Sequence, residues 1–291
     1  MGSVHLVHDE QLGTEVALKT LKLSSGTDLY RFKREFRAMA DIKHLNLVTL
    51  YELISEGALC FFTMEYVAGV SFDRFLIGSR TASGSRPHSD VILQSVQQLC
   101  VGVHAMHEAG CIHRDLKPSN VLVTEQGRVV ILDFGLAKQT NSGSISSTGL
   151  SGTPAYMAPE QALERPSVPA ADWYAVGIMI YEVLTGHCPF EGALFDVLLR
   201  KQTEDPPPPV QVNPEADELL SELCTRMIHR DPLQRPSGAE ILVRLGASQD
   251  TRSVPRLRRY TPLSMPAQTV LGREDGLSAL YGAYSRMRKG V

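Results

Sequence analysis

Residues 111–135 read CIHRDLKPSNVLVTEQGRVVILDFG, and this stretch decides the fold. A polar loop is followed by two short apolar runs that flank the turn Glu125-Gln126-Gly127, a pattern that predicts a β-hairpin. The hairpin would bring Asn120 and Asp133, at its two open ends, side by side and close in sequence to Asp115. Mg²⁺ prefers oxygen ligands from such side chains and completes its shell with water and phosphate oxygens. The stretch therefore indicates a site for a nucleotide phosphate.

The motifs HRDLKPSN and DFG in this stretch resemble the catalytic loop and the metal-binding loop of the eukaryotic-like, or Hanks-type, serine/threonine protein kinases of bacteria. The resemblance extends from Gly2 to about Gly246. It implies an α+β fold of two lobes: a small antiparallel sheet with one helix in residues 1–67, and a larger, mostly helical lobe in residues 68–246. It also implies ATP and Mg²⁺ as cofactors, with Mn²⁺ as an alternative metal.

Within the catalytic loop, the resemblance implies roles for four side chains. Asp115 is expected to accept the proton of the substrate hydroxyl, and Lys117 to lie near the transferred phosphoryl group. Asn120 and Asp133 are expected to hold the metal. Catalysis of this kind depends mainly on positioning and charge neutralisation, so each group that contacts phosphate matters.

The first lobe contributes a lysine and a glutamate. Residues 1–22 alternate apolar and polar positions around a turn at 11–13, which predicts an antiparallel hairpin whose second strand ends at Lys19. In residues 28–42 apolar side chains recur every three or four positions, which predicts an amphipathic helix with Glu35 at mid-length. By resemblance Lys19 binds the α- and β-phosphates of ATP and Glu35 pairs with Lys19. Without the kinase motifs, Glu35 would be interpreted as an exposed salt-bridge partner within its helix.

The phosphate-covering loop of the family, G-x-G-x-x-G-x-V, is represented here only by Gly2-Ser3-Val4. We expect that the chain starts at an internal methionine inside this loop, so that the first strand is missing. The alternative is a protein that lacks half of its phosphate lid. The hinge between the lobes is expected at residues 66–69, with backbone groups beside it binding adenine. The ATP-binding residues that the resemblance implies are Gly2, Val4, Ala17, Lys19, Met64, Glu65, Val67 and Leu122.

The segment between Asp133 and Glu160 is rich in Ser, Gly and Thr and ends in GTPAYMAPE, which resembles the substrate-binding segment of the family. We expect an activation loop in which a phosphate on Ser146, Ser147 or Thr148 pairs with arginines such as Arg114. The alternative is a plain flexible loop. The structural residues that the resemblance implies are a core histidine, His113, behind Phe134; Thr153; an ion pair of Glu160 with Arg235; and Asp172, which would brace the catalytic loop.

The composition is that of an ordinary globular protein, with 43% apolar residues. Its 5 cysteines form no C-x-x-C pair, which argues against a disulfide framework or a zinc site. No secretion signal or membrane-length apolar run is found, so we expect a cytoplasmic location. Residues 247–291 are basic but lack the interleaved aromatic residues of nucleic-acid platforms, so neither nucleic acid nor membrane is expected as a partner.

Beyond the kinase-like part, residues 247–270 are interpreted as a linker, and LGREDGLSALYGAY at 271–284 resembles the opening of a P-loop ATPase-like regulatory domain that would occupy 271–291. An amphipathic helix is the alternative there. The expected function is a kinase that transfers the γ-phosphate of Mg-ATP to Ser or Thr of protein substrates, with autophosphorylation between self-associated copies. The alternative is a catalytically impaired kinase-fold module that binds ATP or a partner in a larger signalling protein.

Overall fold

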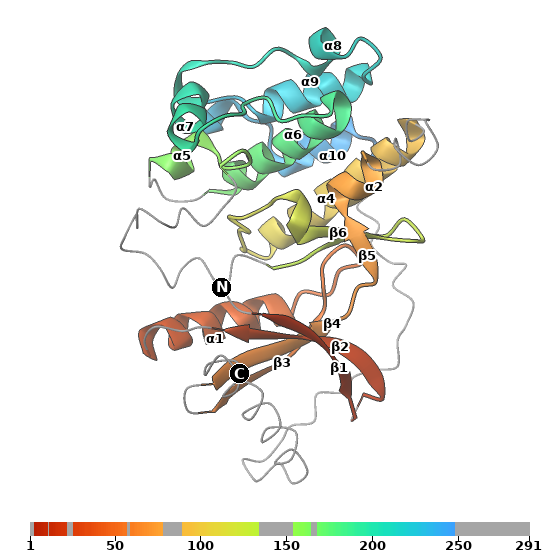
Figure 1. Ribbon diagram of the computed structural model, residues 1–291, viewed down its shortest axis with the longest axis vertical. Coiled ribbons are helices and arrows are strands. Elements are labelled where there is room, and N and C mark those ends of the chain that lie inside the picture. The colour runs from red at the N-terminus through yellow and green to blue at the C-terminus, as the bar shows by residue number, and fades with distance from the viewer. Residues whose placement is uncertain are drawn as a thin grey trace. The chain divides into compact units, whose positions relative to one another are not determined.

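The computed structural model describes residues 3–10, 12–21, 26–56, 59–77, 89–133, 154–163 and 168–247 (Figure 1). All of them belong to one compact unit, Met1–Val254. No helix in these ranges is both long and apolar enough to cross a membrane. Several residues singled out above lie outside the described residues: Gly2, Phe134, Ser146, Ser147, Thr148, Thr153 and the whole of 271–291.

The first lobe is a four-stranded antiparallel sheet with one helix. Its strands are β1 Val4–Asp9, β2 Thr14–Leu21, β3 Leu50–Glu56 and β4 Leu59–Glu65, in the order β1-β2-β4-β3. The predicted first hairpin is confirmed: β1 pairs with β2, and the turn closes at Gly13, whose φ of 63° favours glycine.

Helix α1, Gly26–Ala40, covers this sheet through the apolar stripe that its sequence predicts. The rings of Phe32 and Phe36 lie 6.0 and 5.6 Å from the ring of Phe62 on β4, and all three side chains are buried. Aromatic pairs at such separations contribute both apolar burial and a favourable ring geometry. The contact holds the helix that carries Glu35 against the sheet that carries Lys19.

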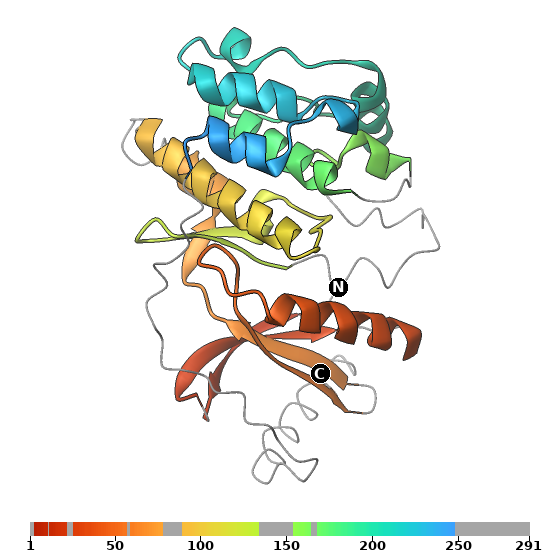
Figure 2. The ribbon, with the colours of Figure 1, turned by 180° about the vertical axis from the view of Figure 1, so that it is seen from behind.

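The second lobe is mostly helical. Helix α6, Pro169–Thr185, is apolar on every side and buried along nearly its whole length, as expected for a central helix. Around it are α2 Phe72–Leu76, α4 Ser89–Glu108, α5 Pro159–Ala162, α7 Leu194–Thr203, α8 Pro209–Val212, α9 Glu218–Met227 and α10 Gly238–Arg244. Figure 2 shows α4 lying over the strands of the second sheet, with α10 beside it.

A small second sheet joins the helices to the first lobe. It consists of β5 Gly69–Ser71, β6 Val121–Thr124 and β7 Val129–Ile131, and the β6–β7 pairing confirms the hairpin predicted from residues 121–132. The loop after α1 adds to this sheet: Ile131 donates to the carbonyl of Asn46 at 2.9 Å, and Val48 donates back to Ile131 at 3.0 Å. These backbone hydrogen bonds fix the first lobe to the edge of the hairpin.

Candidate active site

The catalytic loop is held to the end of β7 by a buried histidine. His113 Nε2 donates to the carbonyl of Leu132 at 2.7 Å, and its Nδ1 accepts from the Asp115 N–H at 3.3 Å. One nitrogen donates and the other accepts, so the ring is neutral. Burial lowers the pKa of His113, which favours the same form. The histidine therefore positions the loop.

Asp172, on α6, braces the same loop from the other side. Its side chain is buried, with Oδ2 accepting from the His113 N–H and Oδ1 from the Arg114 N–H, both at 2.8 Å. His107 Nε2 lies 2.8 Å from Oδ2. A carboxylate that accepts several hydrogen bonds can remain charged in the interior. Asp172 thus joins the central helix to the backbone immediately before Asp115.

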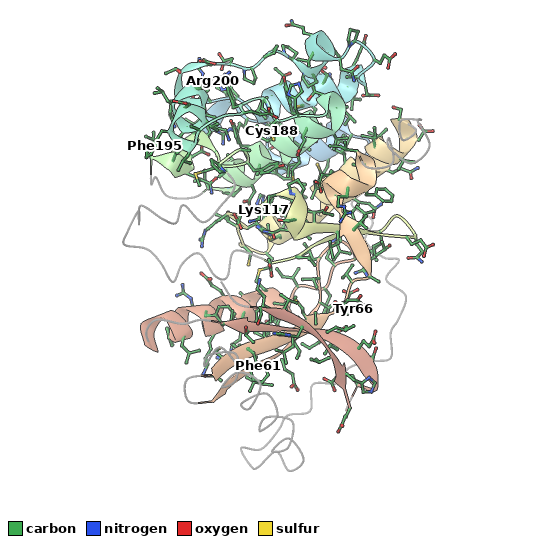
Figure 3. All side chains as sticks on the ribbon, viewed as in Figure 1. Phe61, Tyr66, Lys117, Cys188, Phe195 and Arg200 are labelled. Atoms are coloured by element: carbon green, nitrogen blue, oxygen red, sulfur yellow. The ribbon has the colours of Figure 1, made fainter. Side chains whose placement is uncertain are left out.

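Three polar side chains meet on the loop itself (Figure 3, where Lys117 is labelled). Lys117 Nζ lies 3.2 Å from Asp115 Oδ2. Asn120, in the 3₁₀ turn η1 Pro118–Asn120, donates from Nδ2 to the carbonyl of Asp115 at 2.8 Å. Because the nitrogen of this amide is engaged by Asp115, Oδ1 is the atom of Asn120 that can coordinate a cation.

The β6–β7 hairpin brings Asp133 to this group. Leu132 donates to the carbonyl of Asn120 at 2.8 Å, so the next residue, Asp133, follows directly beside Asn120. Asp133 has a φ of 49°, which is uncommon for a residue other than glycine. Its carboxylate forms an ion pair with Lys19 of β2. The pair joins the two lobes, and both side chains keep some exposure to solvent.

Glu35 of α1 also lies near the start of the catalytic loop. Burial raises the pKa of the Cys111 thiol, and the neighbouring Glu35 carboxylate raises it further. Lys19 forms an ion pair with Asp133, and a pairing of Lys19 with Glu35 stays a prediction.

The residues expected around adenine lie on β2, β4 and β6. Ala17 and Met64 are directly opposite each other in the β2–β4 ladder, and both are buried. Val67 is buried just beyond β4, and Leu122 on β6 is half-buried. Val4 lies opposite Lys19 in the β1–β2 ladder and is exposed.

Arg128, a residue without a motif, binds the last residue of β4. Its Nη1 donates to Glu65 Oε1 at 2.5 Å, and its Nε donates to the carbonyl of Leu45 at 2.8 Å. The Thr49 N–H contacts the other oxygen of Glu65 at 3.3 Å. One arginine in the β6–β7 turn therefore binds two segments of the first lobe.

A pocket opens beside the catalytic loop. Its walls are residues 114–117, the segment 156–157 with Gln161, and Ala171, Asp172 and Ala175 of α6. Gln161 closes one side, because its Nε2 donates to the carbonyl of Arg114 at 3.1 Å while its Oε1 accepts from Ala158 at 2.9 Å. Residues of the stretch 156–161 and of the loop 114–117 thus line the same pocket.

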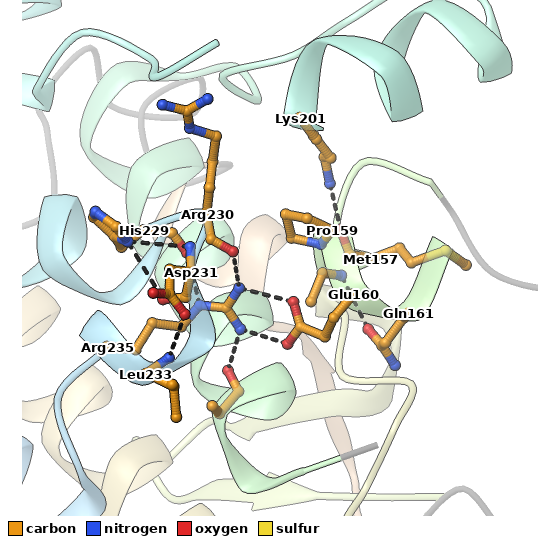
Figure 4. Close-up of polar contacts among 12 residues, drawn as sticks. Met157, Pro159, Glu160, Gln161, Lys201, His229, Arg230, Asp231, Leu233 and Arg235 are labelled. Carbon is orange, nitrogen blue, oxygen red and sulfur yellow. Dashed lines mark hydrogen bonds and ion pairs between the residues drawn. The ribbon is translucent and has the colours of Figure 1, made fainter. Parts of the chain in front are cut away.

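Glu160, next to Gln161, forms an ion pair with Arg235 (Figure 4). Two hydrogen bonds of 2.6 and 2.8 Å join them, and both side chains are nearly inaccessible. The guanidinium also donates to the carbonyls of Ala170, His229 and Arg230 and lies 4.9 Å from the ring centre of Tyr174. Such complete pairing is what a buried charge requires.

Sequence reasoning did not single out three residues of this region: Arg128, Gln161 and Lys201. Each acts through hydrogen bonds from a side chain to a distant backbone carbonyl. Lys201 lies on an amphipathic helix, where a lysine is usually exposed. No spacing in the chain could have revealed these contacts.

The fold and site define a two-lobed domain in which Asp115, Lys117 and Asn120 gather beside the Lys19–Asp133 ion pair that joins the lobes. A family model described as "Protein kinase domain" matches residues 1–244. The chain belongs to this family, and it is a kinase domain of the bacterial serine/threonine type.

Named relatives support the assignment. The chain is 33% identical over 298 residues to the serine/threonine-protein kinase PknA of Mycobacterium tuberculosis, covering 99% of this chain and 67% of the relative. It is 34% identical over 259 residues to the probable serine/threonine-protein kinase pknA2 of Bifidobacterium longum, covering 85% and 34% respectively. It is 31% identical over 245 residues to PrkC of Bacillus subtilis, covering 82% and 37%. The chain therefore spans about a third of the length of two of these relatives.

Proposed function

We propose that this chain is an active kinase that transfers the γ-phosphate of ATP to Ser or Thr hydroxyls of protein substrates. The observation that carries the proposal is the gathering of Asp115, Lys117 and Asn120 beside the Lys19–Asp133 ion pair. These groups come from both lobes, and phosphoryl transfer requires such an arrangement of charge around the reacting phosphate.

The family uses ATP with a divalent metal, and the residues here fit one. The Asp133 carboxylate and the Asn120 amide oxygen lie at the two neighbouring open ends of the β6–β7 hairpin. Both are hard oxygen donors, and such donors bind Mg²⁺ in preference to softer metals. We assign the metal to this pair. When bound, Mg²⁺ neutralises charge on the phosphates and orients them.

Asp115 receives the substrate hydroxyl in this mechanism. As the hydroxyl oxygen forms its bond to the γ-phosphorus, the bond from that phosphorus to the bridging oxygen of ADP breaks and the hydroxyl proton passes to Asp115. Lys117, 3.2 Å from Asp115 Oδ2, supplies a positive charge next to the transferred group. Lys19 supplies a second one to the phosphates that remain on ADP.

Adenine is assigned to the apolar wall made by Ala17, Met64, Val67 and Leu122, with Val4 above it. The backbone of Glu65 and of Val67 would form the hydrogen bonds to the base. Arg128 supports this assignment, because it fixes the Glu65 side chain at the start of the hinge.

Activation by phosphate on Ser146, Ser147 or Thr148 remains part of the proposal. Self-associated copies would phosphorylate each other, and Arg114, whose backbone lies between Asp172 and Gln161, would bind the added phosphate. Replacing the three residues together with alanine should lower the rate of transfer. An unchanged rate in fully phosphate-free enzyme would remove this part of the proposal.

The test of the reaction is incorporation of phosphate from Mg-ATP into myelin basic protein and into the chain itself. Asp133→Ala should abolish incorporation, and excess chelator should do the same to the wild type. Asp205→Ala, at an exposed ion pair, is the matched control and should leave the rate unchanged. If the wild type transfers nothing although ATP raises its melting temperature, the chain is a binding module instead.

A further inference from the structure

Lys201, on α7, is a buried lysine that contacts the substrate-binding segment. Only 1% of the residue is exposed. Its Nζ donates to the carbonyls of Pro154, Ala155 and Met157 at 2.8, 2.5 and 2.7 Å. Figure 4 shows the side chain pointing from α7 to the backbone beside Met157.

These contacts use the full bonding capacity of the side chain. A lysine ammonium has three N–H donors and no acceptor, and here each donor has a carbonyl. In the described part of the chain no carboxylate forms an ion pair with it, and its Nζ lies over the ring of Tyr174, 5.1 Å from the ring centre. A charge that is buried without a counter-ion lowers the stability of the fold. The burial of the Lys201 ammonium group is therefore better explained by a functional role than by stability.

The bonded carbonyls belong to a short stretch, residues 154–157, whose last two residues form part of the wall of the pocket next to Asp115. Tyr156 and Met157, in the bonded stretch, line that pocket together with Asp115 and Lys117. Gln202, the neighbour of Lys201, donates to the carbonyl of Pro159 at 2.7 Å. Helix α7 thus holds the segment 154–159 at four carbonyls, three of them through one ammonium group.

The same wall is connected to the catalytic loop. Gln161, at the end of the segment, accepts from Ala158 and donates to the carbonyl of Arg114, the residue before Asp115. A shift of the segment would therefore change both the surface that a substrate meets and the support of the loop.

We propose that Lys201 is a positioning residue for protein-substrate binding, which fixes the backbone of residues 154–157 and so places Tyr156 and Met157 in the wall of the pocket beside Asp115. This inference rests on the proposed kinase function. A polypeptide bound against residues 154–157 would meet a rigid backbone only while the three carbonyls are held.

The protonation of Lys201 gives the inference a distinctive readout. Burial lowers the pKa of Lys201 to about 7, an effect that the neighbouring Cys188 opposes. Above that pH the amine has two N–H donors for three carbonyls. The unfolded chain keeps its lysine protonated up to about pH 10.5, so loss of the proton near neutrality belongs to the folded state alone.

Other titratable groups pack around Lys201. The pKa of Cys188 is raised to about 11, mainly by burial, so this thiol stays neutral near pH 7. Tyr156 donates to Glu182 at 2.6 Å, and burial raises the pKa of each. Beyond the Tyr174 ring lies the Glu160–Arg235 pair, and on α7 itself the exposed Arg200 pairs with Glu204.

The test compares Lys201→Met and Lys201→Arg with the matched control Arg200→Met, whose charge is exposed on the same helix. Steady-state kinetics with myelin basic protein give KM for the protein and KM for ATP separately. Lys201→Met should raise KM for the protein by about tenfold or more while KM for ATP changes less than about twofold. Lys201→Arg should recover part of the loss, and Arg200→Met should behave as wild type.

The pH profile tests the inference without any mutation. For the wild type, kcat/KM for the protein should fall as the pH rises through about 7, whereas the affinity for ATP should not follow this change. In Lys201→Met, where the variant folds, kcat/KM for the protein should not show this fall with rising pH. Equal changes in both KM values, or a protein KM that does not depend on pH in this range, would overturn the role of Lys201. A wild type that transfers no phosphate would instead refute the kinase proposal.

Discussion

Arg114 adopts a left-handed backbone conformation, with φ at 67°, directly against Asp172, whose Oδ1 accepts the Arg114 N–H at 2.8 Å. Such a conformation is costly for a residue with a side chain and persists only where the surroundings impose it. Here two contacts impose it: the buried carboxylate on the N–H and Gln161 on the carbonyl. Arg114 immediately precedes Asp115. Its strained backbone conformation therefore sets the direction in which Asp115, the proposed proton acceptor, leaves the loop.

Asp172→Asn should therefore impair the reaction more than the fold. The asparagine side chain has only one oxygen. Its NH₂ group would therefore face one of the two backbone N–H groups that now donate to the carboxylate. We expect kcat to fall about ten- to a hundredfold and the free energy of unfolding by about 1–3 kcal/mol. Kinetic assays and urea denaturation measure the two effects.

The control for this substitution is Asp217→Asn. Asp217 caps α9 by accepting from Leu220, and asparagine caps a helix about as well. Its kcat and stability should stay at wild-type values. A folded Asp172→Asn protein with unchanged kcat would contradict the role assigned to the brace.

The Glu160–Arg235 pair should be a major determinant of stability. Glu160→Gln leaves the guanidinium buried without its counter-charge, which typically costs about 3–5 kcal/mol. The exposed pair of Asp205 with Arg230, also hydrogen-bonded twice, gives the comparison: Asp205→Asn should cost about 0–1 kcal/mol. Urea denaturation of both variants measures the difference, and similar losses would show that burial is not the cause.

Arg128→Ala should weaken ATP binding. It removes the hydrogen bonds to Glu65 and to the carbonyl of Leu45, which hold the start of the hinge. We expect KM for ATP to rise by roughly three- to tenfold with little change in KM for the protein substrate. Arg244→Ala, which breaks an exposed pair with Glu222, should change neither value. A rise limited to the protein KM would argue against the hinge assignment.

The buried His113 and the half-buried His44 should make stability depend on pH. Burial lowers the pKa of His113 and of His44 in the folded protein, whereas in the unfolded chain each titrates near 6.5. The unfolded state then binds more protons at these two groups below about pH 6.5, so their contribution to stability is constant above that pH and falls as the pH drops. The slope is up to about 1.4 kcal/mol per pH unit for His113 and smaller for the half-buried His44.

Urea denaturation between about pH 7.5 and 5.5 checks this expectation. His44→Gln removes the contribution of His44 to the pH dependence of the free energy of unfolding. The smaller dependence that remains should come from His113. A flat profile, or an NMR titration of His113 with its ordinary pKa, would show that the ring is not held neutral.

The two hairpins and helix α1 could be predicted because the residue patterns that indicate them lie within a few positions of one another. Alternation of apolar residues around Gly13 and Gly127 predicted both hairpins, and the three- and four-residue spacing of Phe32 and Phe36 predicted α1. The apolar pattern does not mark the start of α6 at Pro169. Proline suits the first turn of a helix, but Ala170 and Ala171 add little to an apolar pattern.

The sequence by itself determined the catalytic motifs, the family and the order of the elements, because each of these is written in neighbouring residues. Only the tertiary structure decided that Lys19 contacts Asp133, that Arg128 holds Glu65, and that Lys201 is buried against residues 154–157. These contacts join positions more than 40 residues apart, and they form because packing buries polar groups that must then find partners. For a lysine on an amphipathic helix, the neighbouring residues do not indicate that its side chain will be buried.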